Sequence, residues 1–159
     1  MLEPDVVDLL ESGCAMLVGF VTAAGTPFAT RGWGMQVLDD GTRARVLVGR
    51  DEVAKLGYPP YGEISTVVAV TGCHVLTLRS TQLKGPIASI EPANDDDLVR
   101  MERYCDAFFD DVAVVDSVPR YLMERLVPAT QLACTFEIIE VYDQTPGPNA
   151  GAPMASKAT

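Results

Sequence analysis

The sequence predicts a mainly β protein with a few helices, in which antiparallel strands close into a barrel. About six segments are strand-like, either as apolar runs or by alternation, and most of them are joined by hairpin-length turns, which favour antiparallel pairing. The chain has 159 residues, a length that suits one domain. Because closure removes most exposed strand edges, we expect a barrel and not an open sheet.

The N-terminal part supplies one helix and three strands. Apolar spacing predicts a short amphipathic helix over residues 3–12, ended by Gly13. Strands are predicted at residues 14–21, 28–38 and 44–48. The pair Asp40-Gly41 lies between the last two and is typical of a hairpin turn.

The middle of the chain contains a helical turn and two longer strands. The turn is predicted at 51–56, and the prolines of 58–62 indicate a loop. Strands follow at 64–70 and 75–84, and residues 86–90 extend the second.

Helical spacing returns after Glu91. Carboxylates at 94–97 suit a helix N-terminus, and the apolar face that follows includes Leu98, Met101, Cys105 and Phe108. A second helix is predicted with Ser117 as N-cap and Pro119 in its first turn, ending at Pro128. Residues 132–138 alternate as a closing strand. We therefore expect one domain over 1–143 and a Gly/Pro-rich tail over 144–159, flexible past Gly151.

The chain is acidic, with 22 Asp and Glu against 12 Lys and Arg and a formal net charge of −10. Nucleic acids and anionic membrane surfaces attract basic faces, so the composition argues against both partners. No apolar run has the ~18–20 residues of a membrane span, and the N-terminus is acidic where a secretory signal is basic. We expect a cytoplasmic protein. Residues 1–92 carry seven basic against ten acidic residues, closer to balance than the remainder.

The four cysteines and the single histidine favour no metal centre. Cys14, Cys73, Cys105 and Cys134 are widely spaced with no Cys-x-x-Cys pair, so we expect reduced, packed thiols and no metal ligands. His74 alone cannot form a His-rich metal site.

Two segments carry candidate binding residues. In the first, Thr30-Arg31-Gly32-Trp33-Gly34, glycines inside a strand are typical of close approach by a ligand or another backbone, and an arginine can hold a phosphate. The alternative is that Trp33 is core, the glycines form bulges and Arg31 lies at the surface.

The second segment is Arg79-Ser80-Thr81-Gln82-Leu83-Lys84-Gly85. Alternation places Arg79, Thr81 and Leu83 on one face of a strand and Ser80, Gln82 and Lys84 on the other. The second face could bind a polyol chain or the edge of a heterocycle. The alternative is an ordinary solvated face of an antiparallel sheet.

Together with Val48-Gly49-Arg50 and the following turn that holds Lys55, these segments resemble the flavin-binding split β-barrels related to pyridoxamine 5′-phosphate oxidase. The resemblance spans roughly residues 8–142 and rests on the order and spacing of the three segments. It implies an antiparallel split barrel that forms a homodimer with FMN at the subunit interface.

The resemblance also implies roles for individual residues. Arg31 and Lys55 would contact the FMN phosphate. Backbone groups around Gly32 to Gly34 and at Gly49 would lie along the flavin, and Thr30 and Trp33 are expected to bind the cofactor too. The side chains expected near the flavin or its ribityl chain are Ser80, Gln82 and Lys84.

Two departures bear on the activity. Ala54 stands where the family often has an arginine, and the ending Gln144-Thr145-Pro146-Gly147-Pro148 does not match the Arg- and His-containing substrate segment of the true oxidase. We therefore do not expect pyridoxamine phosphate oxidation. The ending could fold over a partner's flavin or form a surface loop.

Three functional hypotheses follow from the resemblance. The first is an FMN-dependent oxidoreductase that acts on a small organic substrate, with no catalytic side chain identified. The second is a flavin-binding or sensing protein without turnover. The third keeps the barrel but changes the ligand to a deazaflavin or to haem. For haem iron, His74 is the one conceivable nitrogen ligand. We expect Tyr104, Phe108 and Phe109 to pack the helical segment and not to stack on flavin.

Overall fold

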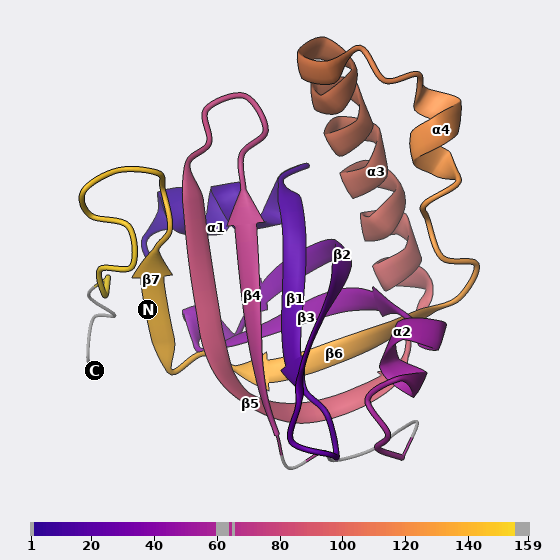
Figure 1. Ribbon diagram of the computed structural model, residues 1–159, viewed down its shortest axis with the longest axis vertical. Helices are drawn as coiled ribbons and strands as arrows, with labels where there is room; N and C mark the ends of the chain where they lie inside the picture. Colours follow the sequence, from indigo (N-terminus) through magenta and orange to yellow (C-terminus); the bar gives the residue numbers. More distant parts are fainter. Residues whose placement is uncertain (1, 60–63, 65, 155–159) are drawn as a thin grey trace.

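The computed structural model describes residues 2–59, 64 and 66–154. It contains one antiparallel sheet, four α-helices and a short 3-10 turn (Figure 1). The elements are α1 (Pro4–Glu11), β1 (Ala15–Val21), β2 (Pro27–Leu38), η1 (Asp39–Gly41), β3 (Arg43–Gly49), α2 (Arg50–Ala54), β4 (Val67–Cys73), β5 (Ser80–Pro92), α3 (Asp95–Asp116), α4 (Arg120–Glu124), β6 (Gln131–Glu137) and β7 (Glu140–Asp143).

The sheet closes into a barrel, as the sequence predicts. Its strand order is β4-β1-β2-β3-β6-β5, and an additional pairing of β5 with β4 closes the ring. β7 adds to the other edge of β5. Within the ring the pairings are antiparallel.

The long strand β5 changes partners along its length. Its first half, up to Pro86, pairs with β4, and residues 81–84 also pair with β7. Its second half, 87–92, pairs with β6. At the change, a Cβ on Gly85 would lie 1.7 Å from the carbonyl oxygen of Glu137. Glycine at 85 is therefore required for β6 to leave β5 at this point.

Alternate residues of the strands fill the barrel interior. In β1 the side chains of Met16, Val18 and Phe20 are buried, whereas Leu17 between them is 59% exposed. β3 and β6 contribute buried residues in the same way, among them Val46, Val48, Leu132, Cys134 and Phe136. The interior is therefore an apolar core.

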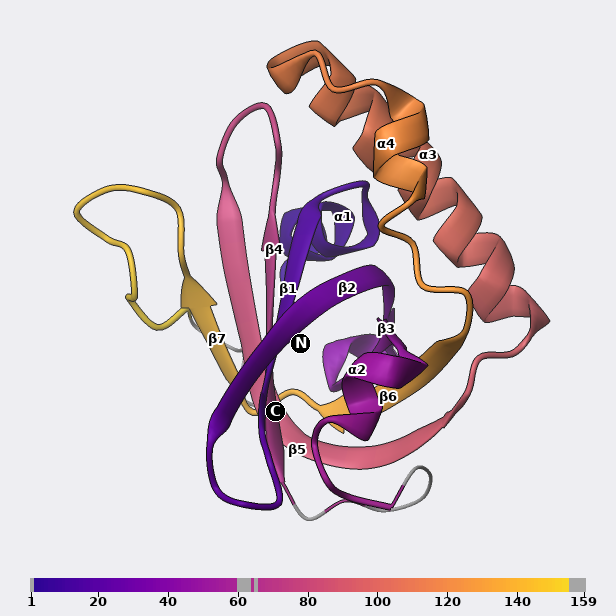
Figure 2. The same cartoon turned by 45° about the vertical axis from the view of Figure 1, so that its right-hand side comes forward.

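The helix α3 runs beside the barrel, and α4 returns alongside it (Figure 2). Helix α3 buries Tyr104, Phe108 and Phe109, as the sequence predicts. The rings of Tyr104 and Phe108 stack with 5.7 Å between their centroids. Its first turn is held by a capping box, in which Asn94 and Asp97 each accept a hydrogen bond from the other's backbone N–H.

Asp97 also joins α3 to the sheet. Its carboxylate accepts hydrogen bonds from Arg45 of β3 at 2.6 Å and from Arg100 at 2.9 Å. Arg45 further donates to Glu91 of β5 and Thr135 of β6. Burial alone would raise the pKa of Asp97, but the hydrogen bonds from Arg45, the backbone of Asn94 and Arg100 outweigh it and hold this pKa below its usual value.

Two boundary predictions are wrong. Ser117 does not begin a helix: it ends α3 in a left-handed conformation (φ 54°), and Pro119 is the N-cap of α4. Residues 75–79 form a loop and not the start of a strand. In that loop Leu78 has a positive φ of 61°, and Nδ1 of His74 accepts the backbone N–H groups of Leu76 and Thr77.

Other predictions differ in extent. The predicted strand at 64–70 begins only at Val67, and residue 65 within it lies outside the described residues. In the predicted loop at 58–62, residues 60–62 also lie outside the described residues. β7 was not predicted as a separate strand. Residues 151–154 also fold back onto it, since Asp143 N–H donates to Ala152 and Met154 N–H to Val141.

We predict that Asp97→Asn lowers the free energy of unfolding by about 3 kcal/mol, because it leaves two arginines poorly compensated at a buried site. A carboxylate with a lowered pKa stabilises the fold above its unfolded-state pKa and loses that contribution as the pH falls through its folded-state value. The parent should therefore lose stability below about pH 5 more steeply than the variant.

Urea unfolding at pH 7 and at lower pH, followed by the fluorescence of the single Trp33, measures both effects. Asp96→Asn is the control, because Asp96 is exposed in the same helical turn. Equal stability of Asp97→Asn and Asp96→Asn would contradict the role of the Arg45–Asp97 pair.

We also predict that Gly85→Ala costs at least about 3 kcal/mol, because the added Cβ meets backbone that cannot swing away. Gly19→Ala is the matched control within the same sheet, since a Cβ there meets Ala69 at an ordinary 3.8 Å. The control should change stability by less than ~1 kcal/mol. Thermal unfolding compares the two, and similar midpoints for both variants would argue against the crossing at Gly85.

Candidate functional site

Three predicted site residues lie on one outer surface of the barrel. The cross-strand register of β2, β1, β4, β5 and β7 aligns a row of Arg31, Leu17, Thr71, Gln82 and Tyr142. The adjacent row is Ala29, Gly19, Ala69, Lys84 and Glu140. Cross-strand partners share a face of a sheet, and Leu17 is exposed. We call these two rows the outer sheet face.

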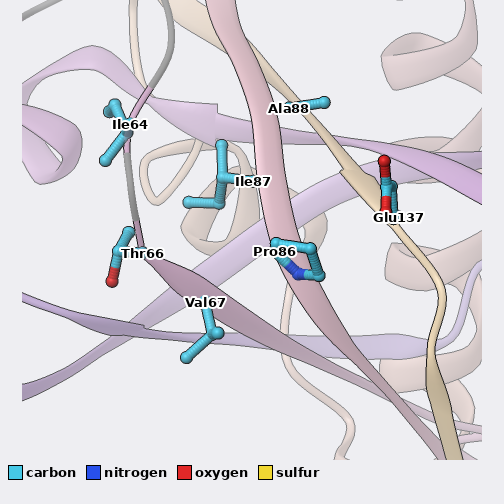
Figure 3. A pocket seen from close by; sticks show the side chains of 7 residues that line it. All are labelled: Ile64, Thr66, Val67, Pro86, Ile87, Ala88 and Glu137. Carbon is cyan, nitrogen blue, oxygen red and sulfur yellow. The ribbon is translucent and has the colours of Figure 1, made fainter.

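The outer sheet face is hollowed where β1, β4 and β5 lie side by side. A cavity of about 240 Å³ lies among residues that include Gly19, Ala69, Lys84 and Ile139. A larger hollow of about 600 Å³ adjoins it at Val67. The side chains around this second hollow are mostly apolar, and Glu137 is their one carboxylate (Figure 3).

Arg31 is held by aromatic rings at the β2 end of this face. Its guanidinium carbon lies 5.9 Å from the ring centre of Trp33 and 5.5 Å from that of Phe108 on α3. Among the described residues, Arg31 has no carboxylate partner. Its N–H groups are therefore available to an anion.

Gln82 and Lys84 lie farther along the face, on β5. The amide of Gln82 donates to the hydroxyl of Thr71 at 2.9 Å. The ammonium of Lys84 lies 4.5 Å from the ring centre of Tyr142, whose hydroxyl donates to Glu140. With strands ~4.8 Å apart, three strand spacings separate Arg31 from Gln82 by roughly 14 Å of backbone.

Lys55 is placed differently from Arg31. It caps the C-terminal end of α2, pairs with Glu52 at 2.8 Å and lies 6.0 Å from the ring centre of Phe28. Phe28 and Arg31 are three residues apart on β2, so their side chains lie on opposite faces of that strand. Thr30 is partly buried and shares the face of Phe28. The structure does not bring Arg31 and Lys55 into contact, and a shared phosphate stays a prediction.

The remaining predicted site residues are buried. Trp33 is 2% exposed, and Ser80 uses its hydroxyl to donate to Leu78. A Cβ at Gly32 would lie 2.7 Å from Met16, and one at Gly49 would lie 2.8 Å from Pro128. Internal packing thus accounts for glycine at both positions, and ligand contact through these backbones stays a prediction.

Arg79 does not join the strand that the sequence predicts for it. It precedes β5 and forms an exposed ion pair with Asp5 of α1 at 2.6 Å. Thr81 and Leu83 are buried, while Gln82 and Lys84 face outward, so the predicted alternation is confirmed from Thr81 onward.

The four cysteines are free thiols, and burial raises the pKa of Cys14 and of Cys134 to about 12. The thiols of Cys14 and Cys134 are therefore protonated at neutral pH. Within the described residues, no group of three or more His, Cys, Asp or Glu is arranged to hold a metal ion. One ring nitrogen of His74 is already used by its own loop.

Sequence reasoning did not identify Leu17, Thr71, Tyr142 or the contact of Phe108 with Arg31. The first three join the face through the register of β1, β4 and β7 with their neighbouring strands. The Phe108 contact depends on how α3 docks, for which the sequence carries no local signal.

Comparison with solved structures relates this architecture to known proteins. HupZ from Group A Streptococcus aligns over 95% of this chain and 100% of its own, with a TM-score of 0.54 and 16% identity. A protein named F420 reductase aligns over 84% and 93%, with a TM-score of 0.50 and 16% identity. A candidate pyridoxamine 5′-phosphate oxidase from Lactobacillus delbrueckii aligns over 89% and 93%, with a TM-score of 0.48 and 14% identity.

The fold therefore defines the chain as an antiparallel split β-barrel. This closed antiparallel architecture is the fold that the sequence resemblance implies. No protein-family model and no curated protein sequence matches the chain. In the part of the chain that the structure describes, no helix combines the length and apolar character of a membrane span.

Proposed function

We propose that this chain is an FMN-dependent oxidoreductase that binds its flavin between two copies of the barrel and acts on a small organic substrate. The proposal adds FMN, the homodimer and turnover to the shared fold. The similarity to a protein named F420 reductase supports a flavin-like cofactor, since F420 is a deazaflavin.

The observation that carries the proposal is the state of Arg31. In a chain of net charge −10, this arginine has no acidic partner among the described residues and is held between two aromatic rings. The rings restrict the guanidinium, so less conformational entropy is lost when it binds a ligand. A half-buried, restricted and uncompensated guanidinium suits a phosphate group.

The rest of the outer sheet face suits the remainder of FMN. Thr71 and Gln82 offer hydroxyl and amide groups of the kind that bind a ribityl chain, and the small residues Gly19 and Ala69 leave a flat floor. The flavin ring supplies the redox chemistry when bound. The side chains of this face bind and orient it, and no acid or base from the protein is required.

The homodimer is supported by the apolar character of the same face. Leu17 is 59% exposed, Val67 52% and Ile139 59%, and all three border the hollows described above or the outer sheet face itself. Exposed apolar groups gathered on one surface favour a protein interface. Two copies facing each other here would bring Arg31 of one protomer toward the partner's face.

The competing function is flavin binding without turnover, and it uses the same residues. A reduction assay distinguishes the two functions. An oxidoreductase would have its bound flavin reduced by NADH or NADPH and reoxidised by an acceptor, whereas a protein that only binds flavin would leave it oxidised. Haem is a further alternative through His74, and His74→Ala with an unchanged cofactor spectrum would exclude it.

We predict that the purified chain takes up FMN and that Arg31→Ala weakens this affinity about tenfold to a hundredfold, the effect of losing a charged hydrogen bond. Lys55→Ala should weaken it less, because that ammonium is already paired with Glu52. Quenching of FMN fluorescence on titration measures each dissociation constant.

Arg43→Ala is the control for these titrations, since Arg43 is exposed at the end of the β2–β3 hairpin and pairs with Asp39. It should bind FMN like the parent. A parent that does not bind added FMN defeats the proposal. A parent that binds, with an Arg31→Ala variant of equal affinity, defeats the phosphate assignment.

We predict that the parent sediments as a dimer of the 17.1 kDa chain and that Leu17→Asp sediments as a monomer, because two carboxylates would be buried at the interface. Val115→Asp is the control, since Val115 is also an exposed apolar residue but lies on α3. Sedimentation velocity distinguishes the species. If both variants remain dimeric, the interface lies elsewhere.

A further inference from the structure

A separate cavity of about 270 Å³ lies between the end of α1, β2 and α3. Its polar lining is richer than that of the hollows on the outer sheet face. The side chains that can contact a ligand there are Glu11, Ser12, Gln36, Arg100, Arg103 and Tyr104. None of them belongs to the candidate flavin site.

Small residues keep this cavity open. A Cβ at Gly13 would lie 2.5–2.6 Å from Ala107 and the backbone of Phe108, so the segment that follows α1 meets α3 almost backbone to backbone. Close contact at this point sets the distance between the two helices and β2. Ser12, Gly13 and Ala107 all line the cavity without filling it.

One side of the cavity is cationic. Arg100, Arg103, Tyr104 and Ala107 follow the i, i+3, i+4, i+7 spacing that forms one stripe of a helix. Arg100 is fixed by hydrogen bonds to Asp97 at 2.9 Å and to Gln36 at 2.7 Å, and a guanidinium with five donors keeps others free. Arg103 is exposed and forms no ion pair within residues 2–59, 64 and 66–154.

The other side is anionic. Oε1 of Glu11 accepts the backbone N–H of Val37 at 2.7 Å, which fixes this carboxylate at the cavity. Its second oxygen accepts no hydrogen bond from the described residues. Since Asp97 already balances Arg100, the charges left to a ligand are one cation, Arg103, and one anion, Glu11.

We propose that this cavity binds a small zwitterion, an α-amino acid by its size and charge. The ligand carboxylate accepts hydrogen bonds from Arg103 and Arg100, and its ammonium donates to Glu11. A simple anion would face the carboxylate of Glu11, and a simple cation would face Arg103. Opposite charges on one small molecule satisfy both sides.

Isothermal titration of the full chain with single L-amino acids tests the proposal, with acetate and ethylamine as probes that carry only one of the two charges. We expect at least one amino acid to bind with a millimolar or lower dissociation constant and to bind at least tenfold more tightly than either probe. Arg103→Gln and Glu11→Gln should each weaken that binding at least tenfold, the scale of one charged hydrogen bond.

Glu11→Gln keeps a carbonyl oxygen for the Val37 N–H, so the variant retains the local fold, and thermal unfolding checks this. Arg125→Gln, on the segment after α4, is the matched control and should bind like the parent. The proposal is overturned if no amino acid binds at 10 mM, if acetate binds equally well, or if binding survives in both cavity variants. Flavin uptake is measured separately, so failure of one proposal does not affect the other.

Discussion

The architecture depends on the close crossing of two backbones at Gly85. The carbonyl oxygen of Glu137 occupies the position where any other residue would place its Cβ. Because of this contact, β5 can pair with β4 and β7 along its first half and with β6 along its second half. β6 pairs with β5 on one side of that point, and Gln82 and Lys84 of the outer sheet face lie on the other.

A second constraint fixes the helical layer to the barrel. Asp97 combines a helix cap with ion pairs to β3 and to its own helix, and Arg45 extends the network to β5 and β6. The pair fixes the start of α3, and the contact of Gly13 with Ala107 fixes its middle. Phe108 is thereby placed over Arg31, and the arginines of α3 are placed along the second cavity. Both candidate sites therefore depend on how α3 docks.

Local chemistry in the sequence predicted the fold well and the site in part. A dense apolar run identified β1, alternation identified β3 and β6, and the Asp40-Gly41 pair identified the hairpin between β2 and β3. The errors at Ser117 and at 75–79 have a common cause: both segments contain a non-glycine residue with positive φ, which sequence patterns do not reveal. Arg31, Gln82 and Lys84 were identified as polar groups in strands, but their common face arises from register across five strands. The position of Lys55 on the other side of β2 depends on the packing of α2 against Phe28, which is a tertiary contact.

The folding back of residues 151–154 affects how the sheet ends. β7 is the last strand in the order, and its outer N–H and C=O groups would otherwise be open to any extended chain. The backbone of Ala152 and Met154 occupies several of these groups, and Tyr142 forms a bridge with Pro153. Proline has no N–H to offer a further strand. A chain cut after Asp143 would keep its barrel, but the outer edge of β7 would have unpaired backbone groups. Such a chain would aggregate at concentrations where the intact chain stays monodisperse.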